Sequence, residues 1–154
     1  MKPIVRKATL NDLSILLKFE QGLIAAERPM DPSIMDGSIN YYDISELINK
    51  DDSDVFVVEI KSEIVASGYV KIKQDRHYSK NQNMGYLGFM FVPKVHRGNG
   101  YNQHLVEALI AWCHKRKIYE IRLDVYTNNP AAIRAYEKAG FSGYLLNMKY
   151  QKDN

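Results

Sequence analysis

The feature that most constrains the fold is an apolar segment that runs directly into a glycine-containing turn. Residues 84–92 contain no Asp, Glu, His or Lys, and the sequence continues as PKVHRGNGYN over residues 93–102. A strand this apolar is typical of the centre of a sheet, where both faces are covered. Apolar residues then recur at helical spacing at Leu105, Leu109 and Cys113. The order predicts a central strand, a glycine turn and a helix that packs flat on the sheet.

The turn between this strand and this helix has the geometry of a phosphate-binding site. Glycines let the backbone approach a ligand closely, and the first N–H groups of a helix have no partner inside it. Arg97 adds a forked cation that suits phosphate oxygens. An ordinary strand-to-helix turn would look the same, so this segment alone leaves both interpretations open.

Length and composition limit the remaining choices. The 154 residues predict one domain spanning residues 1–154, and a net charge of +3 gives no reason to expect nucleic acid. No apolar run approaches the roughly 20 residues of a membrane helix, and Met1-Lys2-Pro3 begins no signal peptide, so we expect a cytoplasmic location. The single cysteine, Cys113, is expected in the core. No histidine pair has metal-ligand spacing, so no metal is expected.

Periodicity and turn signals predict the other elements. Thr9 and Asp12 form a capping-box pattern at the start of the first helix, and Asn129-Pro130 opens the last one. The predicted order is strand, helix, helix, three strands, helix, strand, helix, strand (β-α-α-β-β-β-α-β-α-β). This indicates an α/β fold with a mostly antiparallel sheet flanked by helices. The strands are expected at residues 4–8, 55–60, 64–73, 84–92, 118–126 and 141–150.

Two segments together resemble the GCN5-related N-acetyltransferase (GNAT) superfamily. Arg97-x-x-Gly100-x-Asn102 resembles its pyrophosphate turn, and Asn129-x-x-Ala132-x-x-x-Tyr136-x-x-x-Gly140-Phe141 resembles its later helix. The predicted element order also matches that fold over nearly the whole chain. The resemblance implies binding of acetyl-coenzyme A and acetyl transfer to a primary amine by direct attack in a ternary complex.

The resemblance also implies cofactor-binding positions. The turn would give backbone N–H groups to the diphosphate, and the preceding strand would pair with the pantetheine arm. A bulge, for which Gly88 is the candidate, would splay that strand from the next one. The implied cofactor-binding residues are Phe91, Val92, Arg97, Gly98, Asn99, Gly100, Tyr101, Asn102, Asn129 and Ala132. Asn102 departs from the usual Gly or Ala, and we expect it to cap the helix start and leave its amide free.

The chemistry needs a neutral amine and a group that stabilises the leaving thiolate. Tyr136 matches the family tyrosine that acts as the acid. The strand before the turn has no carboxylate, so Asp124 on the next strand is the candidate base, by resemblance to bacterial N-terminal acetyltransferases of ribosomal proteins. An ordinary solvent-facing Asp is an equally good interpretation. Glu20 and Glu27 are candidates for binding a cationic acceptor.

Several alternatives stay open at this stage. The fold could serve a non-catalytic coenzyme A-binding sensor, because the strand carboxylate is absent. A nucleotide-binding protein is disfavoured, because no Gly-Lys-Ser/Thr follows the turn. The expected partner is a small-molecule amine or a peptide N-terminus, with no nucleic acid and no membrane. A homodimer is also open, since dimers are frequent in the superfamily.

Overall fold

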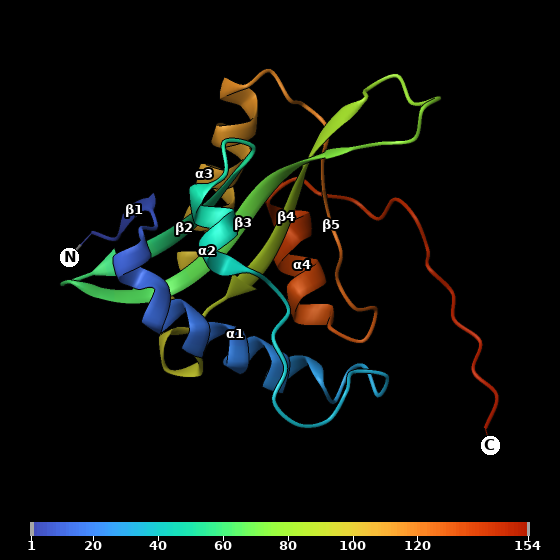
Figure 1. Cartoon of the computed structure of the whole chain (residues 1–154), viewed down its shortest axis with the longest axis horizontal. Coiled ribbons are helices and arrows are strands. Elements are labelled where there is room, and N and C mark those ends of the chain that lie inside the picture. The colour runs from blue at the N-terminus through green and yellow to red at the C-terminus, as the bar shows by residue number, and fades with distance from the viewer. Residues whose placement is uncertain (1, 154) are drawn as a thin grey trace.

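The computed structural model describes residues 2–153, which form a five-stranded sheet with helices on both faces (Figure 1). The sheet order is the chain order: β1 (Ile4–Lys7), β2 (Ser53–Ile60), β3 (Glu63–Gln74), β4 (Asn83–Phe91) and β5 (Ile121–Leu123). Strands β1 to β4 pair antiparallel, whereas β4 and β5 pair parallel. A parallel pair needs a crossover, which the helix between them supplies. The predicted mixed α/β fold is confirmed.

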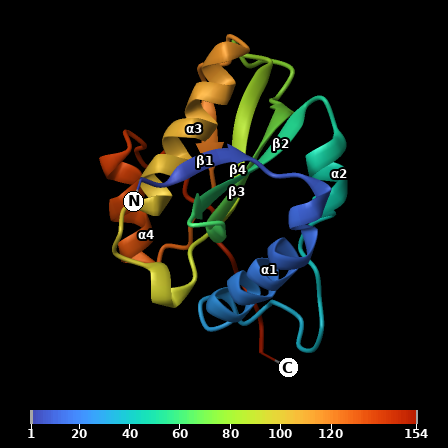
Figure 2. The same ribbon diagram turned by 90° about the vertical axis from the view of Figure 1, so that its left-hand side faces the viewer.

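The helices divide between the two faces of the sheet (Figure 2). They are α1 (Leu13–Glu27), α2 (Ile44–Asn49), α3 (Tyr101–Lys115) and α4 (Pro130–Lys138), with short 3-10 turns at Leu10–Asp12 and Lys94–His96. The predicted capping box before α1 is present, with the Thr9 N–H donating to Asp12 Oδ2 at 2.8 Å. No helix within residues 2–153 is long and apolar enough to cross a membrane.

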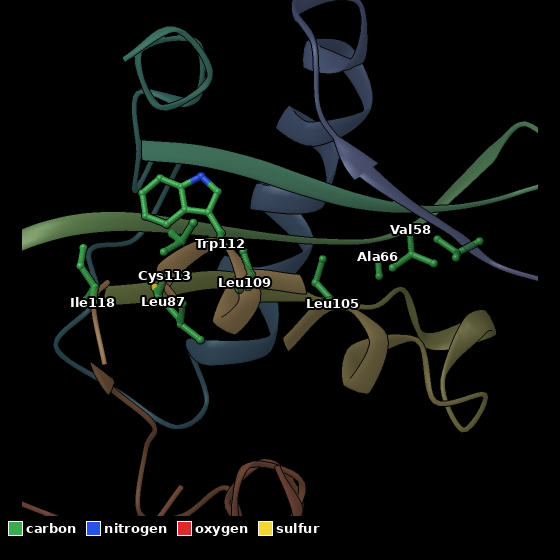
Figure 3. Packing of buried hydrophobic residues seen from close by; sticks show 10 residues of the cluster. Val58, Ala66, Leu87, Leu105, Leu109, Trp112, Cys113 and Ile118 are labelled. Carbon is green, nitrogen blue, oxygen red and sulfur yellow. The ribbon is translucent and has the colours of Figure 1, made fainter. Parts of the chain in front are cut away.

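The core lies in two layers, one on each side of the sheet. On one side α3 packs its apolar face on the strands (Figure 3), and its buried residues are Leu105, Val106, Leu109, Trp112 and Cys113. On the other side the buried cluster draws on α1, α2 and the strands, including Leu16, Phe19, Ile44, Val57 and Phe89. Cys113 is fully buried as predicted, and burial raises the pKa of its thiol to about 11.

The C-terminal part of the chain departs from the sequence prediction. Residues 141–150 alternate like a strand, but in the structure they form none. Gly140, at φ 104°, ends α4, and the chain then runs as an extended arm apart from β5 (Figure 1). A strand exists only with a hydrogen-bonded neighbour, and within residues 2–153 no strand pairs with this segment. The strand β5 is also shorter than predicted, because β4 and the chain after Leu123 diverge.

Candidate active site

The predicted phosphate turn folds as an open loop at the N-terminus of α3. Gly98 and Gly100 have φ values of 84° and 76°, a conformation that glycine adopts readily and other residues rarely adopt. Gly100 is the N-cap of α3, so no capping side chain occupies the first amides of the helix. A Cβ added at either glycine would meet no atom within 4 Å. The loop therefore offers free N–H groups at the positive end of a helix, which suits a diphosphate.

Two side chains of the loop stabilise its shape. Arg97 Nε donates to the Val92 carbonyl at 2.9 Å, and Asn99 Nδ2 donates to the His96 carbonyl at 2.9 Å. Both residues are exposed. Within residues 2–153 the two terminal nitrogens of Arg97 have no hydrogen-bond partner, so this cation is available to an anion at the loop.

The expectation that Asn102 caps the helix is wrong. The helix begins at Tyr101, two residues earlier than a cap at Asn102 would allow, and Gly100 is the N-cap residue. The left-handed conformation of Gly100 ends the loop there, which places Asn102 inside the first helical turn. Its backbone N–H is thus one of the first amides of the helix, without help from its side chain.

Strands β4 and β5 diverge beside this loop. They pair only at Gly85–Ile121, Tyr86–Arg122 and Leu87–Leu123, although β4 continues to Phe91. On its other side β4 shifts register after Gly88, and Phe89 has a positive φ of 56°. The predicted bulge is therefore present, one residue beyond the proposed glycine. Within residues 2–153, the β5-facing edge of β4 has no paired strand beyond Leu87, next to the glycine loop.

The side chains at the end of β4 secure this edge against α1. The Phe91 ring packs on Phe19, with ring centroids 5.4 Å apart. A Cβ at Gly22 of α1 would lie 2.6 Å from the Phe91 ring, so the helix and the strand are in close contact there. Because the side chain is held on this side, the backbone of Phe91 and Val92 can face a ligand in the gap.

The candidate acid, Tyr136, lies on α4 near a carboxylate from the first helix. Burial raises the pKa of Tyr136 to about 12, and the charge of Glu27 acts in the same direction. Glu27 is the last residue of α1 and is half-buried, and this desolvation raises its own pKa. The phenol of Tyr41 opposes that rise. The fold thus brings Tyr136 and Glu27, which are far apart in the sequence, into one electrostatic environment.

The candidate base, Asp124, lies where the two strands diverge. It directly follows β5, is exposed, and its Oδ2 accepts a hydrogen bond of 2.7 Å from the Tyr86 hydroxyl. Burial and then this hydrogen bond raise the pKa of Tyr86. Burial also raises the pKa of Tyr69 to about 12, with a further contribution from the charge of Asp124. Both phenols therefore stay protonated beside this carboxylate.

The expectation that Glu20 binds an acceptor is wrong. Its side chain is completely buried, and Oε2 accepts from the Tyr41 and Tyr42 backbone N–H groups at 2.9 and 2.8 Å. Glu20 follows the apolar stripe of α1, so it faces inward, and the loop after α1 folds over it. It holds that loop in place instead of contacting a ligand.

Asn129 and Ala132 lie together at the start of α4. Asn129 is the N-cap, and its Oδ1 accepts from the Ala132 N–H at 3.3 Å, while Pro130 is the first helical residue. The helix start predicted from the Asn-Pro pair is confirmed. Contact of these residues with a cofactor stays a prediction from the family resemblance.

Sequence reasoning missed a group of polar aromatic residues in the loop after α1 and in the chain after β5. The Tyr126 hydroxyl donates to Asp31 Oδ2 at 2.7 Å, between residues 95 positions apart. Hydrogen bonds from Ser33 and then Tyr126 lower the pKa of Asp31 to about 2. Tyr41 and Tyr42 line a hollow of about 270 Å³ that extends toward α2. No local signal in the sequence joins these residues, because they come from separate loops and strands.

An open glycine loop at a helix N-terminus, beside two diverging strands, is the architecture of an acyl-coenzyme A-binding fold. The chain belongs to the GNAT acetyltransferase family, whose family model, "Acetyltransferase (GNAT) family", matches residues 22–141. Acetyl-coenzyme A is the cosubstrate of this family. The loop and the unpaired edge of β4 fit it, since they provide backbone groups where its diphosphate and its extended arm need them.

Individual relatives agree with this assignment. The chain is 34% identical over 74 residues to N-alpha-acetyltransferase 30 of Saccharomyces cerevisiae, covering 48% of this chain and 42% of that protein. It spans about half the length of the curated relatives it matches. A mutant of the BH1408 protein of Bacillus halodurans has the same fold, with a TM-score of 0.87, 21% identity, and coverage of 97% of this chain and 99% of that one. A predicted acetyltransferase from Clostridium acetobutylicum, solved with acetyl-CoA, has a TM-score of 0.73 at 20% identity, covering 97% and 96%.

Proposed function

We propose that the protein transfers the acetyl group of acetyl-coenzyme A to the α-amino group of a peptide or small amine, by direct attack in a ternary complex. The observation that carries this proposal is the juxtaposition of the open glycine loop and the unpaired edge of β4 with a group of carboxylates and tyrosines. The likeness to N-alpha-acetyltransferases supports the choice of acceptor.

The cosubstrate would be held mainly by backbone groups. The amides from Gly98 to Asn102 would bind the diphosphate, with the free nitrogens of Arg97 adding charge. The backbone of Phe91, at the end of β4, and of the next residue Val92 would pair with the extended arm of the cosubstrate, and the start of α4 at Asn129 and Ala132 would lie along it. When bound, acetyl-coenzyme A supplies the acetyl group as a thioester.

Tyr136 would stabilise the sulfur as the thioester bond breaks. A phenol with a pKa of about 12 is protonated throughout the physiological range, so it can always donate a hydrogen bond. A thiol has an ordinary pKa of about 8.5, so complete proton transfer from this phenol to a thiolate would be unfavourable. Tyr136 therefore acts through a hydrogen bond that strengthens as negative charge develops on the sulfur.

The carboxylates favour an α-amine over a lysine as the acceptor. At pH 7 roughly a tenth of an ordinary α-amine is already neutral, compared with less than about a thousandth of a lysine amine. Carboxylates are weak bases, so an acceptor that loses its proton easily suits them better. We assign Asp124 the removal of the proton, where β4 and β5 diverge, and Glu27 the binding of the cationic amine.

The test is release of free thiol with a matched panel of acceptors. One peptide has a free N-terminus and no lysine, and a second differs from it only by a blocked N-terminus and one residue replaced by lysine. We expect thiol release with the first and little with the second. Asp124→Asn should lower kcat, whereas Glu27→Gln should mainly raise KM for the amine. Cofactor binding without thiol release from any amine would favour a coenzyme A sensor instead.

A further inference from the structure

Two lysines of β3, Lys71 and Lys73, lie on tyrosine rings beside the gap between β4 and β5, and we call them the lysine pair. Lys73 Nζ is 4.3 Å from the centroid of the Tyr86 ring, and Lys71 Nζ is 5.9 Å from the same centroid. Lys71 Nζ is also 5.6 Å from the ring centroid of Tyr69. A phenol ring attracts a cation over its face, so these contacts hold both side chains along the sheet. Both rings belong to the cluster on the α1 and α2 side, which places the two charges on that face.

The lysine pair has no ion-pair partner within residues 2–153. Two residues further along β3 and its following loop, Asp75 is bonded to Arg122, which also donates to Glu120, at 2.7 Å in each case. On the side of α2, Glu46 is paired with Lys50 at 2.6 Å. These carboxylates are neutralised by other cations. The lysine pair therefore presents positive charge without a direct partner.

The Tyr86 side chain connects this positive charge to the proposed base. Its hydroxyl donates to Asp124 Oδ2 at 2.7 Å, while its ring lies under Lys73. Because the ring and the hydroxyl form one rigid group, Lys73 Nζ lies within about 10 Å of the Asp124 carboxylate, the reach of about three extended residues. A peptide whose amine reaches Asp124 can therefore place its second or third residue at the lysine pair.

The surface around the lysine pair has room for such a chain. Residues 71, 73 and 75 alternate onto one face of the strand, and a hollow lies at each end of this row. A hollow of about 270 Å³ includes Tyr42, Tyr69 and Lys71 in its lining, and a second of about 280 Å³ includes Asp75 and Arg122. Figure 1 shows the far ends of β3 and β4 extending beyond α2, which leaves this part of the sheet face open.

We propose that the lysine pair selects acceptors that carry a carboxylate side chain at the second or third residue. This inference rests on the proposed transfer to a peptide N-terminus. A Glu or Asp there would accept a charge-assisted hydrogen bond from a lysine that the rings already hold in place, so less side-chain freedom is lost on binding. A basic residue at the same place would be repelled, which adds to the selectivity.

The first experiment compares three lysine-free peptides that share a free N-terminus and differ only at residues two and three, which are Glu-Glu, Gln-Gln or Arg-Arg. Thiol release should give kcat/KM in that order, with a difference of about 3- to 10-fold at each step, mainly through KM. The preference should weaken as salt rises from about 0.02 to 0.5 M, because exposed charges are screened. Equal kcat/KM for the three peptides would overturn the inference and leave the proposed function intact. Absence of thiol release from all three would overturn the proposed function itself.

Matched variants test whether the preference comes from the lysine pair. Lys71→Glu with Lys73→Glu should invert the order, so that the Arg-Arg peptide becomes the better substrate. The control, Lys18→Glu with Lys115→Glu, makes the same change of net charge at exposed residues of α1 and α3, and it should keep the original order. An unchanged order in the first variant, or inversion in both, would overturn the assignment.

A milder variant keeps the question open to test if the charge reversal disrupts folding, which circular dichroism would show. Lys71→Gln with Lys73→Gln removes the two positive charges and adds no negative charge to the sheet face. We expect this variant to release thiol with the three peptides at nearly equal kcat/KM. A preference for the Glu-Glu peptide as strong as that of the unmodified chain would overturn the inference.

Discussion

The glycine loop and the acceptor side of the gap are built from different kinds of groups. The loop from Arg97 to Asn102 presents backbone amides of one continuous segment, shaped by two glycines at positive φ. The proposed acceptor side, where Glu27, Tyr126 and Tyr136 lie, presents side chains from distant segments. A backbone site depends on local conformation, whereas a side-chain site depends on the whole fold. Substitutions on the two sides should therefore affect different properties of the protein.

The largest expected effect is on the acceptor side, at Tyr136. Removing its hydroxyl in Tyr136→Phe should lower kcat by about 100-fold or more, in the range of positioned acid–base groups. Affinity for coenzyme A should change little, because the loop is untouched. Steady-state kinetics would measure kcat, and isothermal titration calorimetry would measure the affinity for coenzyme A.

The control for this variant is Tyr78→Phe, which removes an exposed hydroxyl that accepts a hydrogen bond from Arg76. It should leave kcat unchanged. A normal kcat in Tyr136→Phe would remove this phenol from the mechanism, and equal losses in both variants would indicate a non-specific effect.

The second-largest expected effect is a loss of protein stability when the buried Glu20 is replaced. Glu20→Ala would leave the Tyr41 and Tyr42 amides without their acceptor, which should cost about 2–4 kcal/mol of the free energy of unfolding. Glu20→Gln keeps one carbonyl oxygen and should cost less. Urea unfolding of the two variants measures the difference. If Glu20→Ala unfolds like the unmodified chain but loses amine binding, the original assignment to the acceptor site would be restored.

The third effect is on the loop side, at Gly100. Valine there would be forced into a left-handed conformation, with a cost of about 1–3 kcal/mol, and cofactor affinity should fall about 10- to 100-fold. Gly37→Val is a matched control, since Gly37 has φ 83° and a Cβ there would also meet nothing within 4 Å. The Gly37→Val variant should lose stability as Gly100→Val does, but its affinity for the cofactor should not change. Equal loss of affinity in both variants would mean that the loop is not the binding site.

The same contrast explains what the sequence could predict. The loop, the capping box at Thr9 and the start of α4 depend on neighbouring residues, so local rules located them. Glu20 was misassigned because helical periodicity places a residue on a face but does not reveal which loop will cover that face. The pair of Tyr126 and Asp31 was not found, because 95 residues separate its members.

The segment after α4 is the opposite case. Residues 141–150 alternate like a strand, but alternation does not show whether a neighbouring strand is available to pair with. The prediction of a last strand at residues 141–150 is therefore wrong. Local pattern determines what an element can become, and only the arrangement of its neighbours determines what it pairs with.

The smallest expected effect separates function from stability at Glu27. Burial raises the pKa of this carboxyl above its ordinary value of 4.5, so its charged form is less favourable in the folded than in the unfolded state. Its contribution to stability is therefore complete below pH 4.5 and is lost as the pH rises through the raised folded value. Glu27→Gln removes that loss, so it should raise the melting temperature at pH 7 and leave it nearly unchanged at pH 4.

The kinetic readout of the same variant completes the comparison of the two sides. If Glu27 binds the acceptor, Glu27→Gln should gain stability at pH 7 and lose amine affinity together, as expected for a group kept in an unfavourable environment for function. Cofactor affinity, which depends on the glycine loop, should not change. A variant with unchanged KM for the amine would show that Glu27 affects only the stability of the acceptor side, and Asp124 would then be the carboxylate to test for amine binding.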